Sequence, residues 1–90
     1  MSTTREILQT MVAARGHIEV FRGSITAREY IYVCRPDGRV LVARDLPREM
    51  LDQLLKQSFV YKDGEENEKR VTTYRLTPDG ENAGAKQQQR

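Results

Sequence analysis

One stretch of the sequence constrains the fold more than any other, because a helical periodicity is followed directly by two extended runs. Apolar residues repeat at the spacing of one helix face over residues 47 to 58. Asp45 or Leu46 is expected to cap this helix, with Pro47 in its first turn. Residues 59 to 77 then give two extended segments around a charged loop, which predicts a β-hairpin. The apolar face of the predicted helix consists of Met50, Leu51, Leu54 and Leu55.

A second helix is predicted near the N-terminus. Thr3 lies three residues before Glu6, the spacing at which two side chains cap each other's backbone amides. Apolar residues continue at helical spacing to Ala14, and Gly16 is expected to end the helix in a left-handed conformation. We therefore predict a helix over residues 4 to 15.

The region between the two helices is rich in aromatic and β-branched residues, which favour strands. Residues 17 to 23 and 28 to 34 each predict a strand. A proline and glycine turn at residues 35 to 38 leads into another extended run, so a β-hairpin is expected over residues 28 to 43. A competing interpretation starts a helix at Thr26, because Thr26 and Glu29 also have capping-box spacing.

These elements predict a small α+β domain, winged-helix-like, with two main helices and two β-hairpins. The chain has 90 residues, of which 38% are hydrophobic and 31% charged, enough for one thin core. This hydrophobic fraction is also higher than that of a disordered chain. The single domain is expected over residues 1 to 80, and residues 81 to 90, with little to bury, are expected to form a disordered tail.

Several functional classes are excluded by what the sequence lacks. One cysteine, Cys34, forms no internal disulfide, and with the single His17 it gives too few soft ligands for zinc, so no metal or cofactor is expected. Cys34 as a thiol nucleophile and His17 as its base would need a third residue that orients His17. The sequence places none there, so no enzyme activity is expected. No apolar run is long enough to span a bilayer, and residues 1 to 15 have no signal-peptide core, so the protein is expected in the cytoplasm without a membrane partner.

The order of features in residues 50 to 80 is specific. A leucine-striped helix ends in the hydrophobic pair Phe59 and Val60, a charged hairpin follows, and the return strand finishes Tyr-Arg-Leu-Thr-Pro-Asp-Gly. This segment resembles the C-terminal half of winged helix-turn-helix domains of the MarR and PadR kind. The N-terminal half departs from that pattern, because a predicted hairpin stands where those domains place a strand and a helix. The resemblance implies a DNA-binding regulator or accessory protein, of bacterial or phage type, that acts as a homodimer.

The resemblance implies that the helix over residues 47 to 58 enters the major groove of duplex DNA. Eleven of the fifteen basic residues are arginine, whose planar fork suits phosphate and base edges. The turn of the first hairpin and the return strand of the second add further cations. The expected DNA-binding residues are Arg35, Arg39, Arg44, Arg48, Gln53, Lys56, Gln57, Lys69, Arg70 and Arg75.

A second function stays open, that of a protein-interaction module of phage or plasmid type that modulates a nucleoprotein partner. Glu49 and Asp52 make the exposed face of the second helix nearly neutral, and the acidic loop repels phosphate. Tyr30 and Tyr32 share one strand face, suited to stacking on bases or to a dimer interface. The plainer interpretation is a solvated surface with ion pairs such as that of Asp52 with Lys56. The expected partner-binding residues are Tyr30, Tyr32, Asp63, Glu65, Glu66 and Glu68.

Overall fold

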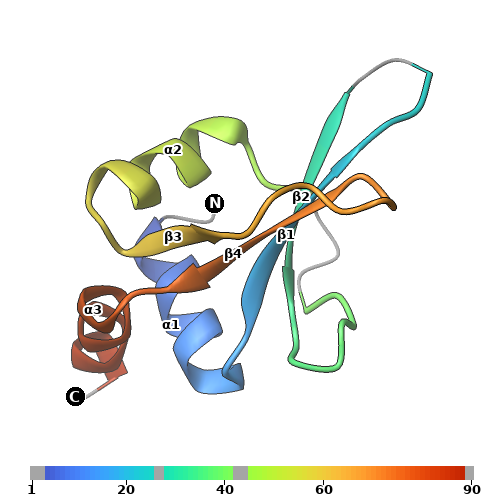
Figure 1. Ribbon diagram of the computed structural model, residues 1–90. Helices are drawn as coiled ribbons and strands as arrows, with labels where there is room; N and C mark the ends of the chain where they lie inside the picture. The colour runs from blue at the N-terminus through green and yellow to red at the C-terminus, as the bar shows by residue number, and fades with distance from the viewer. Residues whose placement is uncertain (1–3, 26–27, 42–44, 89–90) are drawn as a thin grey trace.

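The computed structural model describes residues 4–25, 28–41 and 45–88, with the side chains described as far as residue 85. Its strands form one antiparallel sheet in the order β2-β1-β4-β3 (Figure 1). The predicted α+β class is confirmed, with one helix more than expected and with the four strands β1 to β4 in a single sheet. In chain order the elements are α1 (Thr4–Ala14), β1 (His17–Arg22), β2 (Glu29–Cys34), α2 (Arg48–Lys56), β3 (Val60–Asp63), β4 (Val71–Leu76) and α3 (Pro78–Gln88).

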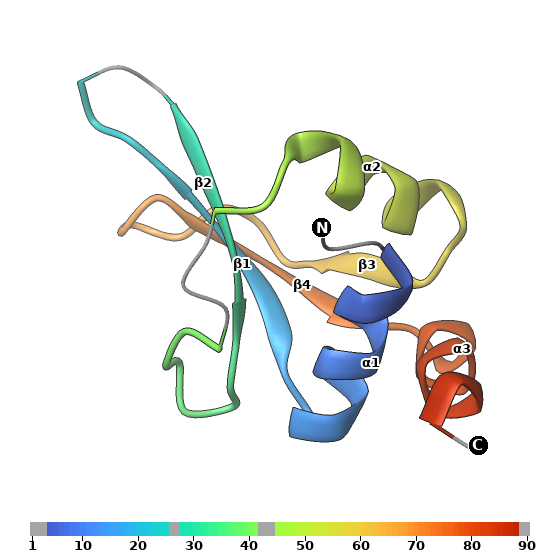
Figure 2. The ribbon, with the colours of Figure 1, turned by 180° about the vertical axis from the view of Figure 1, so that it is seen from behind.

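The core lies between the sheet and the helices α1 and α2. The two opposite views place both helices on one face of the sheet, and α3 beside α1 (Figures 1 and 2). Alternate residues of β1 and β2 point into this core, which leaves the other residues of each strand on the opposite face. The buried core residues are Ile7, Leu8, Met11, Ile18, Val20, Ile31, Val33, Leu46, Leu51, Leu54, Val60 and Tyr74. The sheet therefore has one covered face and one that no helix covers.

The predicted helix over residues 4 to 15 is confirmed as α1, but its end differs from the expectation. Arg15, with φ of 54°, takes the left-handed conformation that was expected of Gly16. The backbone amide of Gly16 donates to the carbonyl of Met11 at 2.8 Å. A Cβ atom at Gly16 would lie 2.4 Å from the carbonyl oxygen of Cys34, so glycine is needed here because α1 and β2 approach closely.

The strand predicted over residues 17 to 23 is confirmed as β1, and it changes the pairing of β2. The hairpin expected over residues 28 to 43 forms only in part, and the main partner of β2 is β1, from His17 opposite Cys34 to Arg22 opposite Glu29. Beyond the turn, a bridge joins Cys34 to Val40, and the amide of Leu41 donates to the carbonyl of Val33 at 2.8 Å. A strand has two edges, so β2 can pair with both segments, and the six-residue strand β1 satisfies more of its backbone groups than the short return does.

Two further expectations fall in this region. The turn at residues 35 to 38 forms as predicted, with the amide of Gly38 donating to the carbonyl of Arg35 at 2.8 Å. The alternative helix from Thr26 is wrong over Glu29–Cys34, which is strand β2. Residues 26 and 27, and 42 to 44, lie outside the described residues.

The predicted helix over residues 47 to 58 is confirmed as α2, but the expected cap is not. Pro47 occupies the N-cap position rather than the first turn, and no side chain caps the helix. The carboxylate of Asp45 instead accepts the backbone amide of Ile31 at 2.7 Å and pairs with Arg28 at 3.3 Å. Asp45 therefore joins the segment before α2 to β2, which draws its side chain away from the helix end.

The hairpin predicted over residues 59 to 77 is confirmed as β3 and β4, with Val60 opposite Leu76. β4 also pairs with β1, where Ile18 lies opposite Tyr74. β4 thus joins the two hairpins, and the helix α2 leads into β3 through Ser58, whose φ is 60°. We call residues 64–70, between β3 and β4, the wing loop.

The disordered tail expected over residues 81 to 90 is wrong, because α3 extends from Pro78 to Gln88. The hydroxyl of Thr77 accepts the backbone amide of Gly80 at 3.0 Å, and Pro78 follows in the first helical position. Gly84 is buried against α1, where few other residues fit. This helix is stabilised by close packing of small residues rather than by a stripe of large apolar ones, which is why its sequence resembles a polar tail.

None of the helices in the described part of the chain is both long and apolar enough to cross a bilayer.

Candidate functional site

The uncovered face of the sheet carries four aromatic side chains, Phe21, Tyr30, Tyr32 and Tyr61, which we call the aromatic face. The register places Phe21 opposite Tyr30 and Tyr61 opposite Arg75, on the side away from the core. The rings of Phe21 and Tyr32 lie edge to face with centroids 6.3 Å apart. Phe21 is 38% exposed and Tyr61 46% exposed, while Tyr30 and Tyr32 are half-buried. The prediction that Tyr30 and Tyr32 share one face is confirmed.

The hairpin of β1 and β2 extends beyond the helices as a projecting arm, residues 21–25 and 28–30 (Figure 1). Ile25 near its end is 96% exposed. The arm is braced by the wing loop, since the backbone amide of Arg22 donates to the carbonyl of Arg70 at 3.1 Å. At the base of the arm the Arg28 guanidinium lies over the Tyr30 ring, 4.8 Å from its centroid. The arm therefore presents an apolar side chain directly to solvent.

The cations expected to bind DNA are spread over the molecule, and several are held by carboxylates of the same chain. Arg48 contacts both Glu29, at 3.0 Å, and Asp52, at 3.1 Å. Burial works against the charged form of Arg48, but these two carboxylates outweigh it and raise the pKa of the guanidinium. Asp52 therefore pairs with Arg48, whereas the helical spacing suggested Lys56 as its partner. Arg39 contacts Asp37 at 3.7 Å.

The remaining expected DNA-binding residues do not converge on one surface. Lys69 is exposed in the wing loop, and neighbouring Arg70 donates to the carbonyl of Gly23 at 3.5 Å. Arg35 lies in the turn after β2, while Lys56 lies at the end of α2. Gln53 and Gln57 of the same helical face contact each other at 3.5 Å, Arg75 contacts Asp63, and Arg44 lies outside the described residues.

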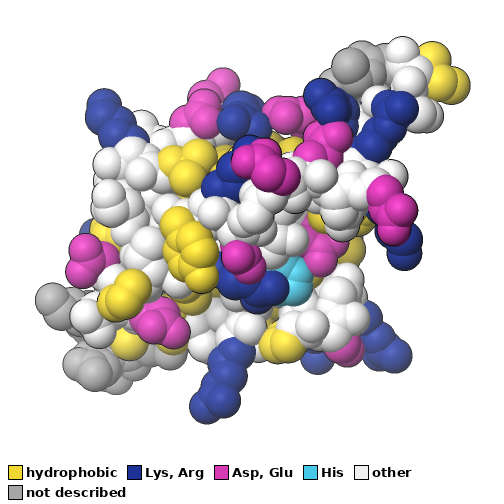
Figure 3. Space-filling view, in the orientation of Figure 1, with side chains coloured by type: hydrophobic (Ala, Val, Ile, Leu, Met, Phe, Trp, Pro, Cys, Tyr) yellow, Lys and Arg dark blue, Asp and Glu magenta, His cyan; other side chains and the backbone are white. Residues whose placement is uncertain are grey.

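The acidic residues expected to bind a partner are largely neutralised within the chain. Glu66 contacts Arg22 of the arm at 2.6 Å, and Glu65 contacts Lys62 at 3.3 Å. Asp63 receives a hydrogen bond from Arg75. Glu68 is exposed and forms no ion pair with any described residue. Figure 3 shows the result on the uncovered face, where positive and negative side chains alternate around apolar ones.

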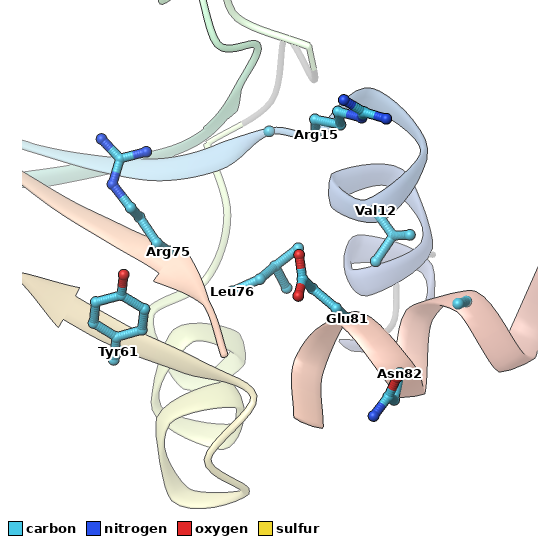
Figure 4. Close-up of a pocket in the computed structure, with 9 residues that line it drawn as sticks. Val12, Arg15, Tyr61, Arg75, Leu76, Glu81 and Asn82 are labelled. Atoms are coloured by element: carbon cyan, nitrogen blue, oxygen red, sulfur yellow. The ribbon is translucent and has the colours of Figure 1, made fainter. Parts of the chain in front are cut away.

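A groove of about 680 Å³ adjoins the aromatic face at Tyr61. Figure 4 shows its walls, with Tyr61 and Arg75 on the strands, Arg15 at the end of α1, and Glu81 and Asn82 on α3. The groove thus has both signs of charge along an aromatic edge. This arrangement suits a mixed polar and apolar surface of another molecule rather than a run of phosphates.

Sequence reasoning missed Phe21, Ile25 and Tyr61, the exposed apolar residues of this surface. Phe21 lies two residues beyond Glu19 in β1, so strand alternation places it on the uncovered face. That signal was present in the sequence. It becomes informative only once the core-facing residues are known, because either face of a strand can be the buried one.

A separate cluster of donor atoms lies near the start of β1. His17 Nε2 is 2.7 Å from a carboxylate oxygen of Glu19, and Cys34 is the cross-strand partner of His17. Burial, followed by the charge of Glu19, raises the pKa of the Cys34 thiol to about 11. The expectation that no third residue orients His17 is wrong, because Glu19 does so. The thiol itself is held in its protonated form.

No known protein family matches this chain, and no characterised protein or solved structure matches it at a significant level.

Proposed function

We propose that this chain is a protein-interaction module whose partner docks on the aromatic face and the projecting arm. The observation that carries the proposal is a contrast between two kinds of side chain. Phe21, Tyr61 and Ile25 stay exposed to solvent, whereas many of the arginines are held by carboxylates of the chain itself. Exposed apolar groups bordered by polar ones are typical of docking surfaces.

The composition of the surface agrees with this function. Protein interfaces are enriched in aromatic residues and arginine, and a few central aromatic anchors usually carry most of the binding energy. Phe21 and Tyr61 are the candidates for such anchors. The groove beside Tyr61 adds Arg15 and Glu81, so the partner is expected to present apolar side chains flanked by charges of both signs. Such paired charges contribute to specificity and orientation more than to affinity.

The experiment is affinity capture from the cells that encode the chain, with three matched baits. The wild-type chain and Gln53→Ser are expected to capture the same protein, because Gln53 is exposed on α2, on the far side of the sheet. Phe21→Ser is expected to lose it by at least about tenfold, as for loss of a central anchor. Equal capture by Phe21→Ser, at unchanged folding by circular dichroism, would contradict the proposal.

A second candidate function is a DNA-binding regulator or accessory protein of winged-helix type. The arrangement that favours it is α2 running into the β3 and β4 hairpin, with β4 paired to β1. Lys69 and Arg70 are exposed in the wing loop, where a wing meets the DNA backbone. Against it, in the part of the chain that is described, a strand and not a helix precedes α2.

Fluorescence anisotropy with random duplex DNA at about 50 mM salt separates the two functions. An interaction module is expected to show no binding to DNA. Its arginines are already paired with carboxylates of the same chain, so they would release few counterions from the DNA. Binding that falls steeply as salt rises would support the DNA-binding function instead. Replacing Glu65, Glu66 and Glu68 by glutamine removes the repulsion between the acidic loop and phosphate. If the anisotropy of the DNA still does not change with this variant, DNA is excluded as the ligand.

A further inference from the structure

Three different metal-ligating side chains meet where β1 begins and β2 ends. His17 and Glu19 are two residues apart on β1, so their side chains lie on the same face of the sheet. Cys34 is directly opposite His17 in the register, which places its side chain on that face too. One ligand atom from each residue lies within 4.8 Å of the other two. The β1 and β2 pairing therefore assembles a nitrogen, an oxygen and a sulfur donor in one place.

The cluster is held in place by burial. Cys34 is 1% exposed and His17 7% exposed, and Glu19 is partly exposed, which leaves a path to solvent on one side. The thiol makes a long contact, of 3.9 Å, to the carbonyl of Tyr32. Bonds to zinc of about 2.0 to 2.3 Å place tetrahedral ligands about 3.3 to 3.8 Å apart. The observed separations, from 2.7 Å between His17 Nε2 and Glu19 to no more than 4.8 Å within the cluster, bracket that spacing.

We propose that His17, Glu19 and Cys34 bind one Zn²⁺ ion, with a water molecule in the fourth position. Imidazole, carboxylate and thiolate together suit zinc, whereas calcium and magnesium prefer oxygen ligands only. On binding, the sulfur to zinc bond forms as the thiol releases its proton to solvent. One thiolate and one carboxylate then balance the two charges of the ion, so the buried site is neutral.

The neighbouring charges allow a cation here. Thr73 of β4, opposite Glu19, is uncharged. The next outward-facing position on β4 is Arg75, whose guanidinium donates to Asp63 and is thereby neutralised. A bound ion would join the first residue of β1 to the last residue of β2. It would therefore fix the end of the β1 and β2 pair that lies opposite the arm.

Cobalt is the probe for this site, because four-coordinate Co²⁺ with a thiolate ligand has intense visible bands and a near-ultraviolet charge-transfer band. The full chain without an affinity tag is titrated with Co²⁺ under anaerobic conditions, and then with Zn²⁺. One equivalent of Co²⁺ is expected to develop both sets of bands, and one equivalent of Zn²⁺ to remove them. Absence of the charge-transfer band in the folded wild-type chain would overturn the proposal without any variant.

Variants then assign the ligands. Cys34→Ala is expected to abolish the charge-transfer band, and Glu19→Gln to weaken Co²⁺ binding by at least about tenfold. Glu66→Gln is the matched control, a carboxylate remote from the cluster, and is expected to bind like the wild type. Circular dichroism and thermal melting establish that each variant is folded. If folded Glu19→Gln binds as tightly as the wild type, the three-residue assignment is wrong.

Discussion

Gly84 of α3 lies against the carbonyl of Leu8 in α1, so closely that a Cβ atom on Gly84 would be 2.8 Å from that oxygen. The same Cβ atom would be 2.5 Å from a methyl group of Val12. The oxygen belongs to a helix backbone and has little room to move. Glycine at this position is therefore a condition for the docking of α3.

Gly84→Ala is expected to destabilise the protein, although alanine is the better helix former. Alanine in a helix gains about 1 kcal/mol over glycine, whereas the forced separation of the two helices costs about 1 to 3 kcal/mol. Urea denaturation measures the balance. Asn82→Ala is the control, since Asn82 is exposed in the same helix and gains propensity without the contact. A more stable Gly84→Ala would mean that α3 does not pack on α1.

Thr77→Val is expected to lower the free energy of unfolding by about 1 to 2 kcal/mol. Valine keeps the shape of threonine but loses two hydrogen bonds, the one accepted from Gly80 at 3.0 Å and the one donated to the Ser58 carbonyl at 2.6 Å. Thr73→Val, a half-buried threonine within β4, controls for the general effect of the substitution. Equal stability of the two variants would argue against the cap.

The Cys34 thiol is expected to make the free energy of unfolding depend on pH in the alkaline range. This holds for the protein kept metal-free with a chelator. Its pKa is about 11 in the folded chain against an ordinary value of 9.0, so the folded state holds the proton more tightly. The resulting stabilisation is fully present below pH 9 and is lost as pH rises through 11. Urea denaturation at pH 8 and pH 10.5 is expected to show a larger loss, by about 1 kcal/mol or more, in the wild type than in Cys34→Ala. Parallel losses in both chains would mean that the thiol titrates normally.

Ile25→Asp separates binding from stability. Because Ile25 is 96% exposed, its replacement is expected to change the free energy of unfolding by no more than about 0.5 kcal/mol. Capture of the partner is nevertheless expected to fall sharply, because the charge replaces the apolar tip of the arm. Undiminished capture by a folded Ile25→Asp would remove the arm from the docking surface and leave only the aromatic face.

Local sequence determined the positions of most elements. The helical spacing of apolar residues predicted α1 and α2 to within a few residues, and the β-branched and aromatic runs predicted all the strands. The alternation of strand residues also placed Tyr30 and Tyr32 on a common face. These features depend on residues close together in the chain, so the sequence can be interpreted without knowledge of the rest of the fold.

Tertiary structure decided how those elements combine. β2 takes β1 as its main partner and pairs only briefly with the segment after its own turn, and α3 forms because Gly84 fits against Leu8. The same long-range register brings Glu19 beside Cys34 and sets Arg22 against Glu66. Each of these outcomes depends on groups that are far apart in sequence. The contacts that stabilise these arrangements form only after the sheet has assembled. For that reason no local sequence pattern predicted the arrangements.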